Sequence, residues 1–170
     1  MEKKKKETPE GDEKEVRIYS LATTANECIV FLEELEGDRL LPIWIGLAEG
    51  QAIAIRFSGI SLPRPLTHDL LLASIETLGW KVQRVVVTDL KENTFYATIY
   101  LASKSGTRTI DARPSDAIAL ALRTQSPIYV EEAVMESAQS VESSRDSMDV
   151  GRLRKWLEGL SEDELGKYKM

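Results

Sequence analysis

The segment from Asp111 to Asp116 places two carboxylates, an arginine and a serine at one point of the chain. Pro114 fixes its own φ and restricts Arg113 to extended geometry, which suits a strand that turns into a helix. Carboxylates near a fixed arginine and a helix N-terminus can hold a divalent cation and an anionic group side by side. Phosphodiester cleavage needs such a cation and such an arginine, because the metal activates water and the arginine stabilises the oxyanion. The same spacing is equally compatible with a structural Asp–Arg pair.

Three further polar residues lie where a helix is predicted to begin. Glu49 follows Gly46, and His68 and Asp69 follow Thr67, which is a good N-cap residue. Each acid has a structural explanation too, because the helix dipole favours an acid in the first turn by about 0.3–1 kcal/mol. His68 is the one histidine of the chain, which excludes a two-histidine metal motif. A lone histidine beside a loop is as compatible with a hydrogen-bonded surface residue as with a general acid or base.

Length and composition limit the class of protein. The chain has 170 residues, 42% hydrophobic and 29% charged, which suits one domain with a real core and excludes a wholly disordered chain. Cys28 is the single cysteine, so an internal disulfide and a Cys-rich zinc site are excluded. The net charge is −6, but residues 16–130 hold eleven Lys and Arg against twelve acids. Nucleic-acid binding usually requires a basic patch, and the nearly neutral charge of this core does not indicate one. A basic patch can still be present locally.

Apolar periodicity and turn residues predict seven strands and three helices. The predicted strands span 16–21, 28–32, 40–45, 80–90, 94–101, 107–112 and 127–130, and the predicted helices span 46–57, 67–78 and 114–124. Strands joined mainly by hairpins, with helices between the groups, predict an α+β fold. We expect a mixed, largely antiparallel sheet with about three helices packed on it.

The composition also divides the chain along its length. Residues 1–14 are polar and predict a disordered lead, and residues 15–136 predict the folded domain. The Ser-rich residues 137–149 predict a linker, and apolar residues at helical spacing in 150–170 predict a C-terminal amphipathic helix.

The sequence also carries expectations about assembly and location. Pro42–Ile45 is a candidate edge strand, and Trp156 and Leu160 have few places to be buried on one small domain, so we expect a homo-oligomer. No apolar run reaches the ~18 residues of a membrane span, and no apolar stretch follows the charged residues 1–6 as in a signal peptide. We therefore expect a cytoplasmic protein with no membrane contact.

These segments together resemble the bifunctional nuclease (BFN) domain family. The resemblance runs from Val16 to Val134 in order, and its most specific strings are PRPLTHDL at 63–70 and DARPSDAIALA at 111–121. Gly50 is a small departure, because the family pattern leads us to expect alanine there. The resemblance implies a nuclease that cuts both DNA and RNA. The polar motif residues carried over by position are Glu49, Arg64, His68, Asp69, Asp111, Arg113, Ser115 and Asp116.

Two hypotheses from different classes follow. In the first, the site performs metal-assisted phosphodiester hydrolysis with Mg²⁺ or Mn²⁺, and His68 serves as general acid or base. The expected catalytic residues are His68, Asp69, Asp111 and Asp116, the metal ligands Asp111, Asp116 and Glu49, and the phosphate ligands Arg64, Arg113 and Ser115. In the second, the chain is a non-catalytic oligomeric binding or regulatory module whose polar residues form structural pairs. Convergence of Asp111, Asp116, His68 and Asp69 within metal-ligand reach in an open cleft favours the first. Burial of Asp111 or Asp116 in a salt bridge with Arg113 favours the second.

Overall fold

The computed structural model describes residues 12–138 and 141–142 of the chain. Its strands are β1 (Glu13–Thr23), β2 (Cys28–Glu34), β3 (Arg39–Ile45), β4 (Lys81–Lys91), β5 (Thr94–Ser103), β6 (Gly106–Ala112), β7 (Ile128–Glu131) and β8 (Val141–Glu142). Its helices are α1 (Leu47–Phe57), α2 (Thr67–Thr77), α3 (Pro114–Thr124) and α4 (Glu132–Ser137). The predicted α+β class is confirmed.

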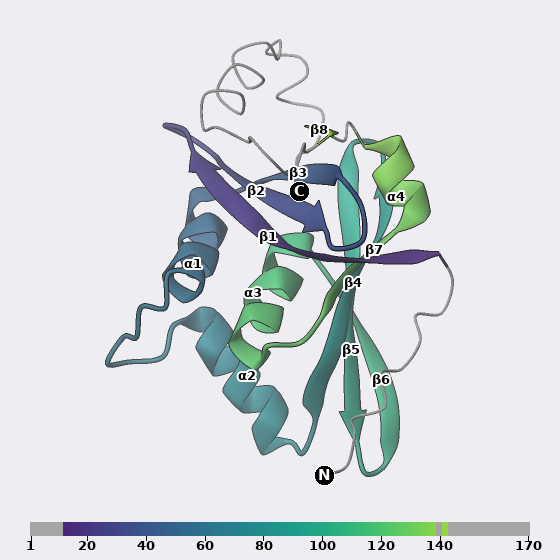
Figure 1. Cartoon of the computed structure of the whole chain (residues 1–170). Coiled ribbons are helices and arrows are strands. Elements are labelled where there is room, and N and C mark those ends of the chain that lie inside the picture. Colours follow the sequence, from purple (N-terminus) through teal and green to yellow (C-terminus); the bar gives the residue numbers. More distant parts are fainter. Residues whose placement is uncertain (1–11, 139–140, 143–170) are drawn as a thin grey trace.

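All eight strands belong to one mixed sheet, in the order β6-β5-β4-β7-β1-β2-β3-β8. The two hairpin-connected groups, β1-β2-β3 and β4-β5-β6, are each antiparallel. The short strand β7 joins them, because it pairs antiparallel with β1 and parallel with β4. Figure 1 shows α1, α2 and α3 on one side of the β4–β6 strands, and α4 on the other side.

The core lies between α3 and the sheet. On β5, the residues that alternate toward the helices are buried, and they include Phe95, Ala97 and Ile99. In α3, every position from Ala117 to Ala121 is buried, because the helix packs against α1, α2 and the sheet at once. Small alanines allow this close approach, and α3 therefore holds the beginnings of its two neighbouring helices in fixed places.

Local signals explain most helix boundaries. Pro114 occupies the first position of α3, and Gly79, with φ of 83°, follows the end of α2, as the sequence predicts. Thr67 differs from its predicted role, because it is the first residue of α2 and Leu66 is the N-cap. The Leu66 N–H donates to Asp69 Oδ2 at 2.9 Å, so the third helical residue caps the helix in place of a cap side chain.

The strands of the structure extend beyond both ends of the predicted domain, residues 15–136. β1 begins at Glu13, inside the predicted lead 1–14, because the Glu13 carboxylate is buried and accepts a hydrogen bond from the Arg84 guanidinium. Val141 and Glu142, inside the predicted linker 137–149, pair with the start of β3. The predicted helix over 150–170 lies outside the described residues.

The strand β3 agrees with its predicted edge character. Pro42, which has no N–H, lies opposite Phe31 of β2, while β8 pairs only with Arg39 and Leu40. Arg39 also ties this strand to α4, because its guanidinium donates to Glu132 Oε1 at 2.6 Å and to Glu34 Oε2 at 2.9 Å. Beyond Leu40, the outer side of β3 has no strand partner among the described residues.

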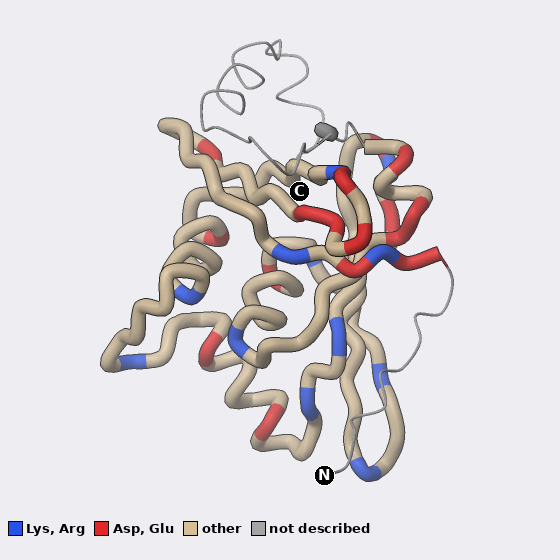
Figure 2. Tube along the Cα trace, viewed as in Figure 1, with Lys and Arg blue, Asp and Glu red and all other residues tan. Residues whose placement is uncertain are grey.

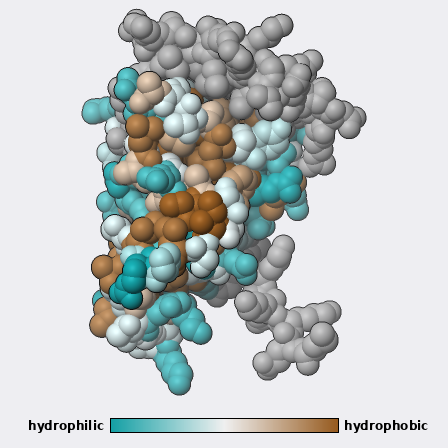
Figure 3. All heavy atoms as spheres, turned by 90° about the vertical axis from the view of Figure 1, so that its left-hand side faces the viewer, coloured by the Kyte–Doolittle hydropathy of each residue, from teal (hydrophilic) through white to brown (hydrophobic). Residues whose placement is uncertain are grey.

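A large part of the exposed apolar surface lies on α1, α2 and the loop between them, on the face that Figure 3 turns to the viewer. The large apolar side chains exposed there are Leu47, Phe57, Ile60, Leu62, Leu70 and Leu71, with Leu78 at the end of α2. Among the described residues, no helix is long and apolar enough to cross a membrane.

Candidate functional site

Four of the predicted residues meet where three helices begin. His68 lies in the first turn of α2, Asp116 in the first turn of α3 and Glu49 in the first turn of α1, while Arg113 is the N-cap of α3. His68 Nε2 lies 2.8 Å from Asp116 Oδ1. Arg113 Nε donates to Asp116 Oδ2 at 2.8 Å, and Arg113 Nη1 lies 3.2 Å from Glu49 Oε1. We call these four residues the His68 cluster.

The charge states in the His68 cluster follow from these contacts. The pKa of Asp116 is lowered from 3.8 to about 2, and the hydrogen bond from His68 is the largest cause. Partial burial acts to raise this pKa, whereas the Arg113 guanidinium acts to lower it. The hydrogen bond to Asp116 in turn raises the pKa of Arg113, with Glu49 adding to the effect. Asp116 is therefore ionised at neutral pH and can only accept hydrogen bonds, so the proton of the shared bond lies on His68 Nε2. In the neutral imidazole, His68 Nδ1 then carries the free lone pair.

Exposure differs among the members of the cluster. The His68 side chain is 12% exposed and that of Asp116 26%, whereas the Arg113 side chain is 53% exposed. Arg113 uses Nε and Nη2 on Asp116 and Nη1 on Glu49, yet its outer face is open to solvent. An anion from solvent can therefore approach Arg113 while Asp116 holds the guanidinium in place.

Asp69, the neighbour of His68, is part of a different arrangement. Its Oδ1 accepts a hydrogen bond from Arg123 Nε at 2.7 Å, and the Arg123 side chain is 1% exposed. Partial burial acts to raise the pKa of Asp69, but the Leu66 N–H and the Arg123 guanidinium together lower it. Asp69 therefore fixes the start of α2 to α3, and the structure places it with a structural partner.

Arg123 is a residue that sequence reasoning missed. Besides Asp69, its Nη1 donates to the Ala119 carbonyl oxygen at 2.8 Å and lies 3.4 Å from that of Ala52 in α1. One guanidinium thus contacts all three helices whose beginnings form the site. A signal was present, because position 123 falls four residues after Ala119 on the apolar face of α3, where a charge is rare without a partner.

Three other predicted site residues have no hydrogen bond or ion pair to the His68 cluster among the contacts of the described residues. Asp111 is exposed near the end of β6 and pairs with Thr98, on the sheet face opposite the helices. Arg64 is exposed in the loop between α1 and α2. Ser115 is fully buried, and its hydroxyl has no hydrogen-bond partner among the described residues. As predicted, Asp111 lies near the end of a strand and Asp116 lies in the first turn of the next helix. The pleat of β6, however, directs the Asp111 side chain away from Asp116, to the sheet face opposite the helices.

The part of the chain that the structure describes forms no ready metal site. Among the described residues, no group of three His, Cys, Asp or Glu side chains is placed to hold a metal ion. Asp116 already accepts hydrogen bonds from His68 and Arg113, and Glu49 is paired with Arg113. Mg²⁺ or Mn²⁺ at Asp111, Asp116 and Glu49 thus stays a prediction, and we derive no chemical step through it.

Comparisons with known proteins define the class. The chain matches the bifunctional nuclease domain family over residues 30–143 and belongs to that family. An uncharacterized protein of Mycobacterium tuberculosis (strain ATCC 25618 / H37Rv) is 38% identical over 161 residues, which cover 88% of this chain and 96% of the relative.

Plant relatives carry the family's name. Bifunctional nuclease 1 of Oryza sativa subsp. japonica is 30% identical over 118 residues, 67% of this chain and 36% of the rice protein. Bifunctional nuclease 2 of Arabidopsis thaliana is 30% identical over 94 residues, 54% of this chain and 29% of the relative. The chain thus corresponds to about a third of the length of these plant proteins.

Proposed function

We propose that this protein is a nuclease that hydrolyses phosphodiester bonds in DNA and RNA, with the His68 cluster as its active site. Membership of the bifunctional nuclease domain family supports the substrate class. The observation that carries the site is the carboxylate of Asp116, which accepts hydrogen bonds from His68 Nε2 at 2.8 Å and Arg113 Nε at 2.8 Å. A base and an anion-binding group are thereby oriented by one side chain.

In the reaction we propose, His68 Nδ1 takes a proton from a water molecule. The water oxygen attacks phosphorus, a new P–O bond forms and the P–O bond to the leaving nucleoside breaks with its electron pair. The leaving oxygen accepts a proton from solvent or from protonated His68. Asp116 stabilises the imidazolium, while Arg113 stabilises the charge on the phosphoryl oxygens. Because the attack uses water and not a 2′-hydroxyl, the same residues serve DNA and RNA.

The alternative is a non-catalytic binding or regulatory module, and one observation favours it. Asp116 forms a salt bridge with Arg113 at 2.8 Å, and Asp69 forms one with Arg123 at 2.7 Å, which ties α2 to α3; both are the structural pairs expected of this alternative. In that case Arg113 would bind an anionic ligand without chemistry.

Cleavage assays on matched variants test the proposal. His68→Gln removes the base but keeps a hydrogen-bonding side chain of similar reach, and we expect at least a hundred-fold loss of cleavage of single-stranded and double-stranded DNA and RNA. The control is Glu76→Gln on the same helix, an exposed acid outside the cluster. Each protein is assayed with EDTA, with Mg²⁺ and with Mn²⁺, which tests the predicted cation directly. Cleavage by His68→Gln at the rate of the parent protein would refute the assignment, and no cleavage by the parent under any condition would favour the binding module.

A further inference from the structure

The sheet face opposite α1–α3 carries a row of aromatic and hydroxyl side chains. On β5, Tyr96, Thr98 and Tyr100 alternate with buried residues and so share this face. Tyr100 lies opposite Thr109 of β6, so the row continues onto the edge strand, and Asp111, opposite Thr98, adds one acid to this face. Tyr96 is 41% exposed, which is high for an aromatic residue in a strand interior.

Cationic side chains lie against both rings. The Arg84 guanidinium is 4.1 Å from the centroid of the Tyr100 ring and is also bonded to Glu13, so it holds that ring in place. Lys91 Nζ lies 5.8 Å from the centroid of the Tyr96 ring and 2.5 Å from Asp89 Oδ2, and the Lys91 side chain is largely exposed. Arg84 occupies one face of the Tyr100 ring, whereas the Tyr96 ring is 41% exposed and offers a flat surface beside a cation on which a base can stack.

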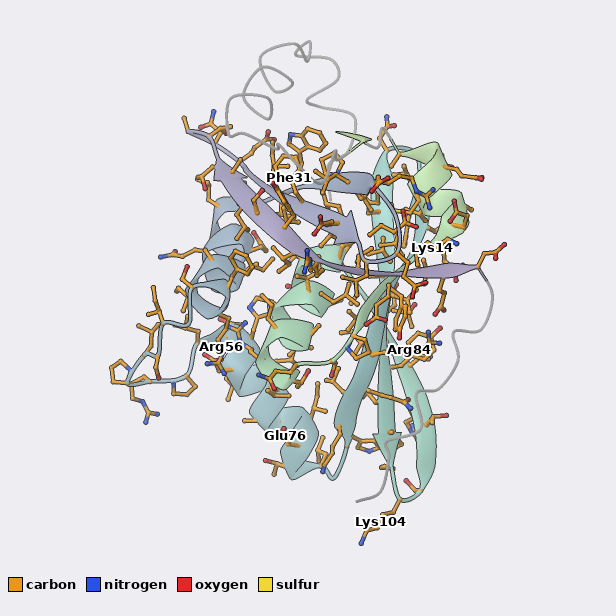
Figure 4. All side chains as sticks on the ribbon, in the orientation of Figure 1. Lys14, Phe31, Arg56, Glu76, Arg84 and Lys104 are labelled. Atoms are coloured by element: carbon orange, nitrogen blue, oxygen red, sulfur yellow. The ribbon has the colours of Figure 1, made fainter. Side chains whose placement is uncertain are left out.

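The charge of this part of the sheet differs from that of the whole chain. Residues 81–112 hold five Lys and Arg (81, 84, 91, 104, 108) and three acids (89, 92, 111), a net of +2, against −6 for the chain. Lys104 projects from the turn between β5 and β6, and Arg84 lies beside β4 and β7 (Figure 4). Blue segments follow β4–β6, whereas red segments gather around β1 and α4 (Figure 2).

The row leads to the proposed active site. Ala97 of β5 pairs with Ala112, the last residue of β6, and Arg113 is the next residue in the chain. Tyr96 therefore lies at the end of β5 and β6 from which the chain continues to Arg113, and Lys104 marks the other end. Because Tyr96 lies on the sheet face opposite α1–α3, a bound strand would reach Arg113 around this end of the sheet. From Ala102 to Tyr96 the strand advances about 20 Å at roughly 3.3 Å per residue, enough for several stacked or extended nucleotides.

We propose that this face, the Tyr96–Tyr100 platform, binds a single strand of nucleic acid by base stacking and directs its backbone to Arg113. The proposal rests on the proposed function for the chemical class of the ligand, but the binding itself needs no cleavage. Stacking needs unpaired bases, because the ring faces of a duplex are covered by their neighbours. The basic residues near the β5–β6 turn would contact phosphates at the far end of the strand.

Fluorescence anisotropy tests the platform with a labelled 15-nucleotide oligo-dT and a labelled duplex of the same length. Measurements in EDTA, after confirming that the probes stay intact, separate binding from turnover. We expect the single strand to bind more tightly than the duplex, and Tyr96→Ala to weaken single-strand binding at least five-fold. Tyr96→Phe, which keeps the ring, should bind as the parent does. Lys104→Glu should weaken binding and reduce its dependence on salt concentration.

The matched control is Phe57→Ala, which removes an exposed aromatic side chain from α1 on the other side of the molecule. Circular dichroism confirms that each variant is folded. Equal binding of the single strand by the parent, Tyr96→Ala and Tyr100→Ala would overturn the platform, even if cleavage is observed. Tyr96-dependent binding without cleavage would instead support the platform and contradict the proposed nuclease activity.

Discussion

Replacing Asp116 with asparagine tests how much the His68 cluster contributes to stability. The substitution keeps the size of the side chain and one carbonyl oxygen, but it removes the negative charge. In the structure that charge is shared between His68 Nε2 and the Arg113 guanidinium, and the side chain is only 26% exposed. The variant therefore loses two charge-assisted hydrogen bonds without a change in shape.

The pKa of Asp116 sets the expected magnitude. A fall from 3.8 to about 2, at about 1.36 kcal/mol for each pKa unit, corresponds to about 2 kcal/mol of stability at neutral pH. Because the folded pKa lies below the unfolded one, this contribution is complete above about pH 5. It is lost as the pH falls toward 2, where the carboxylate of the folded protein also takes up a proton.

Urea unfolding at pH 7, 5 and 3 measures the difference directly. We expect Asp116→Asn to be about 2 kcal/mol less stable than the parent at pH 7 and at pH 5. The difference should fall to roughly half at pH 3, because the folded carboxylate takes up its proton only near pH 2. The control is Asp89→Asn, which breaks the exposed pair with Lys91 and should change stability little at any pH. A loss that stays constant from pH 7 to pH 3, or no loss at pH 7, would contradict the electrostatic account of this site.

Three further predictions concern the residues around the site. Arg123→Met should cost about 3 kcal/mol in urea unfolding, because it leaves the half-buried Asp69 unpaired, and Asp69→Asn in the same chain should restore part of the loss. Gly50→Ala should lower the melting temperature and cost about 1–3 kcal/mol of folding stability, because the new Cβ would lie 2.5 Å from Cys28 Cβ. The control Gln51→Ala, at an exposed neighbouring position, should leave the stability nearly unchanged. Light scattering should give a mass above the 19.0 kDa monomer, and Leu70→Lys on the apolar α1–α2 surface should lower it if that surface forms the contact.

The sequence predicted the helices well because local chemistry decides where they begin and end. Pro114 pre-sets the first turn of α3, and Gly79 adopts the positive φ that ends α2. These signals act within a few residues, so they are visible without knowledge of the fold. They placed His68, Asp116 and Glu49 in first turns, and a helix's first turn is where polar groups gather.

The pairings within the site depend on contacts that no local signal reveals. Arg123 and Asp69 are 54 residues apart, and Arg113 and Glu49 are 64 apart, so both pairs exist only because α3 packs between α1 and α2. Asp111 illustrates the reverse case. Its short distance from Asp116 in sequence predicted a shared site, but the register of β6 on β5 places its side chain on the opposite face of the sheet.

Adjacent residues at the start of α2 make separate contacts, and this separation supports the proposed role of the His68 cluster. Asp69 caps the helix through the Leu66 N–H and is held by Arg123, a side chain 1% exposed. This anchoring limits how far the first turn of α2 can move relative to α3. His68 can then meet Asp116 at 2.8 Å with little loss of side-chain freedom during a reaction. The ion pair of Asp69 with the buried Arg123 thus holds the turn that positions His68 in the proposed reaction.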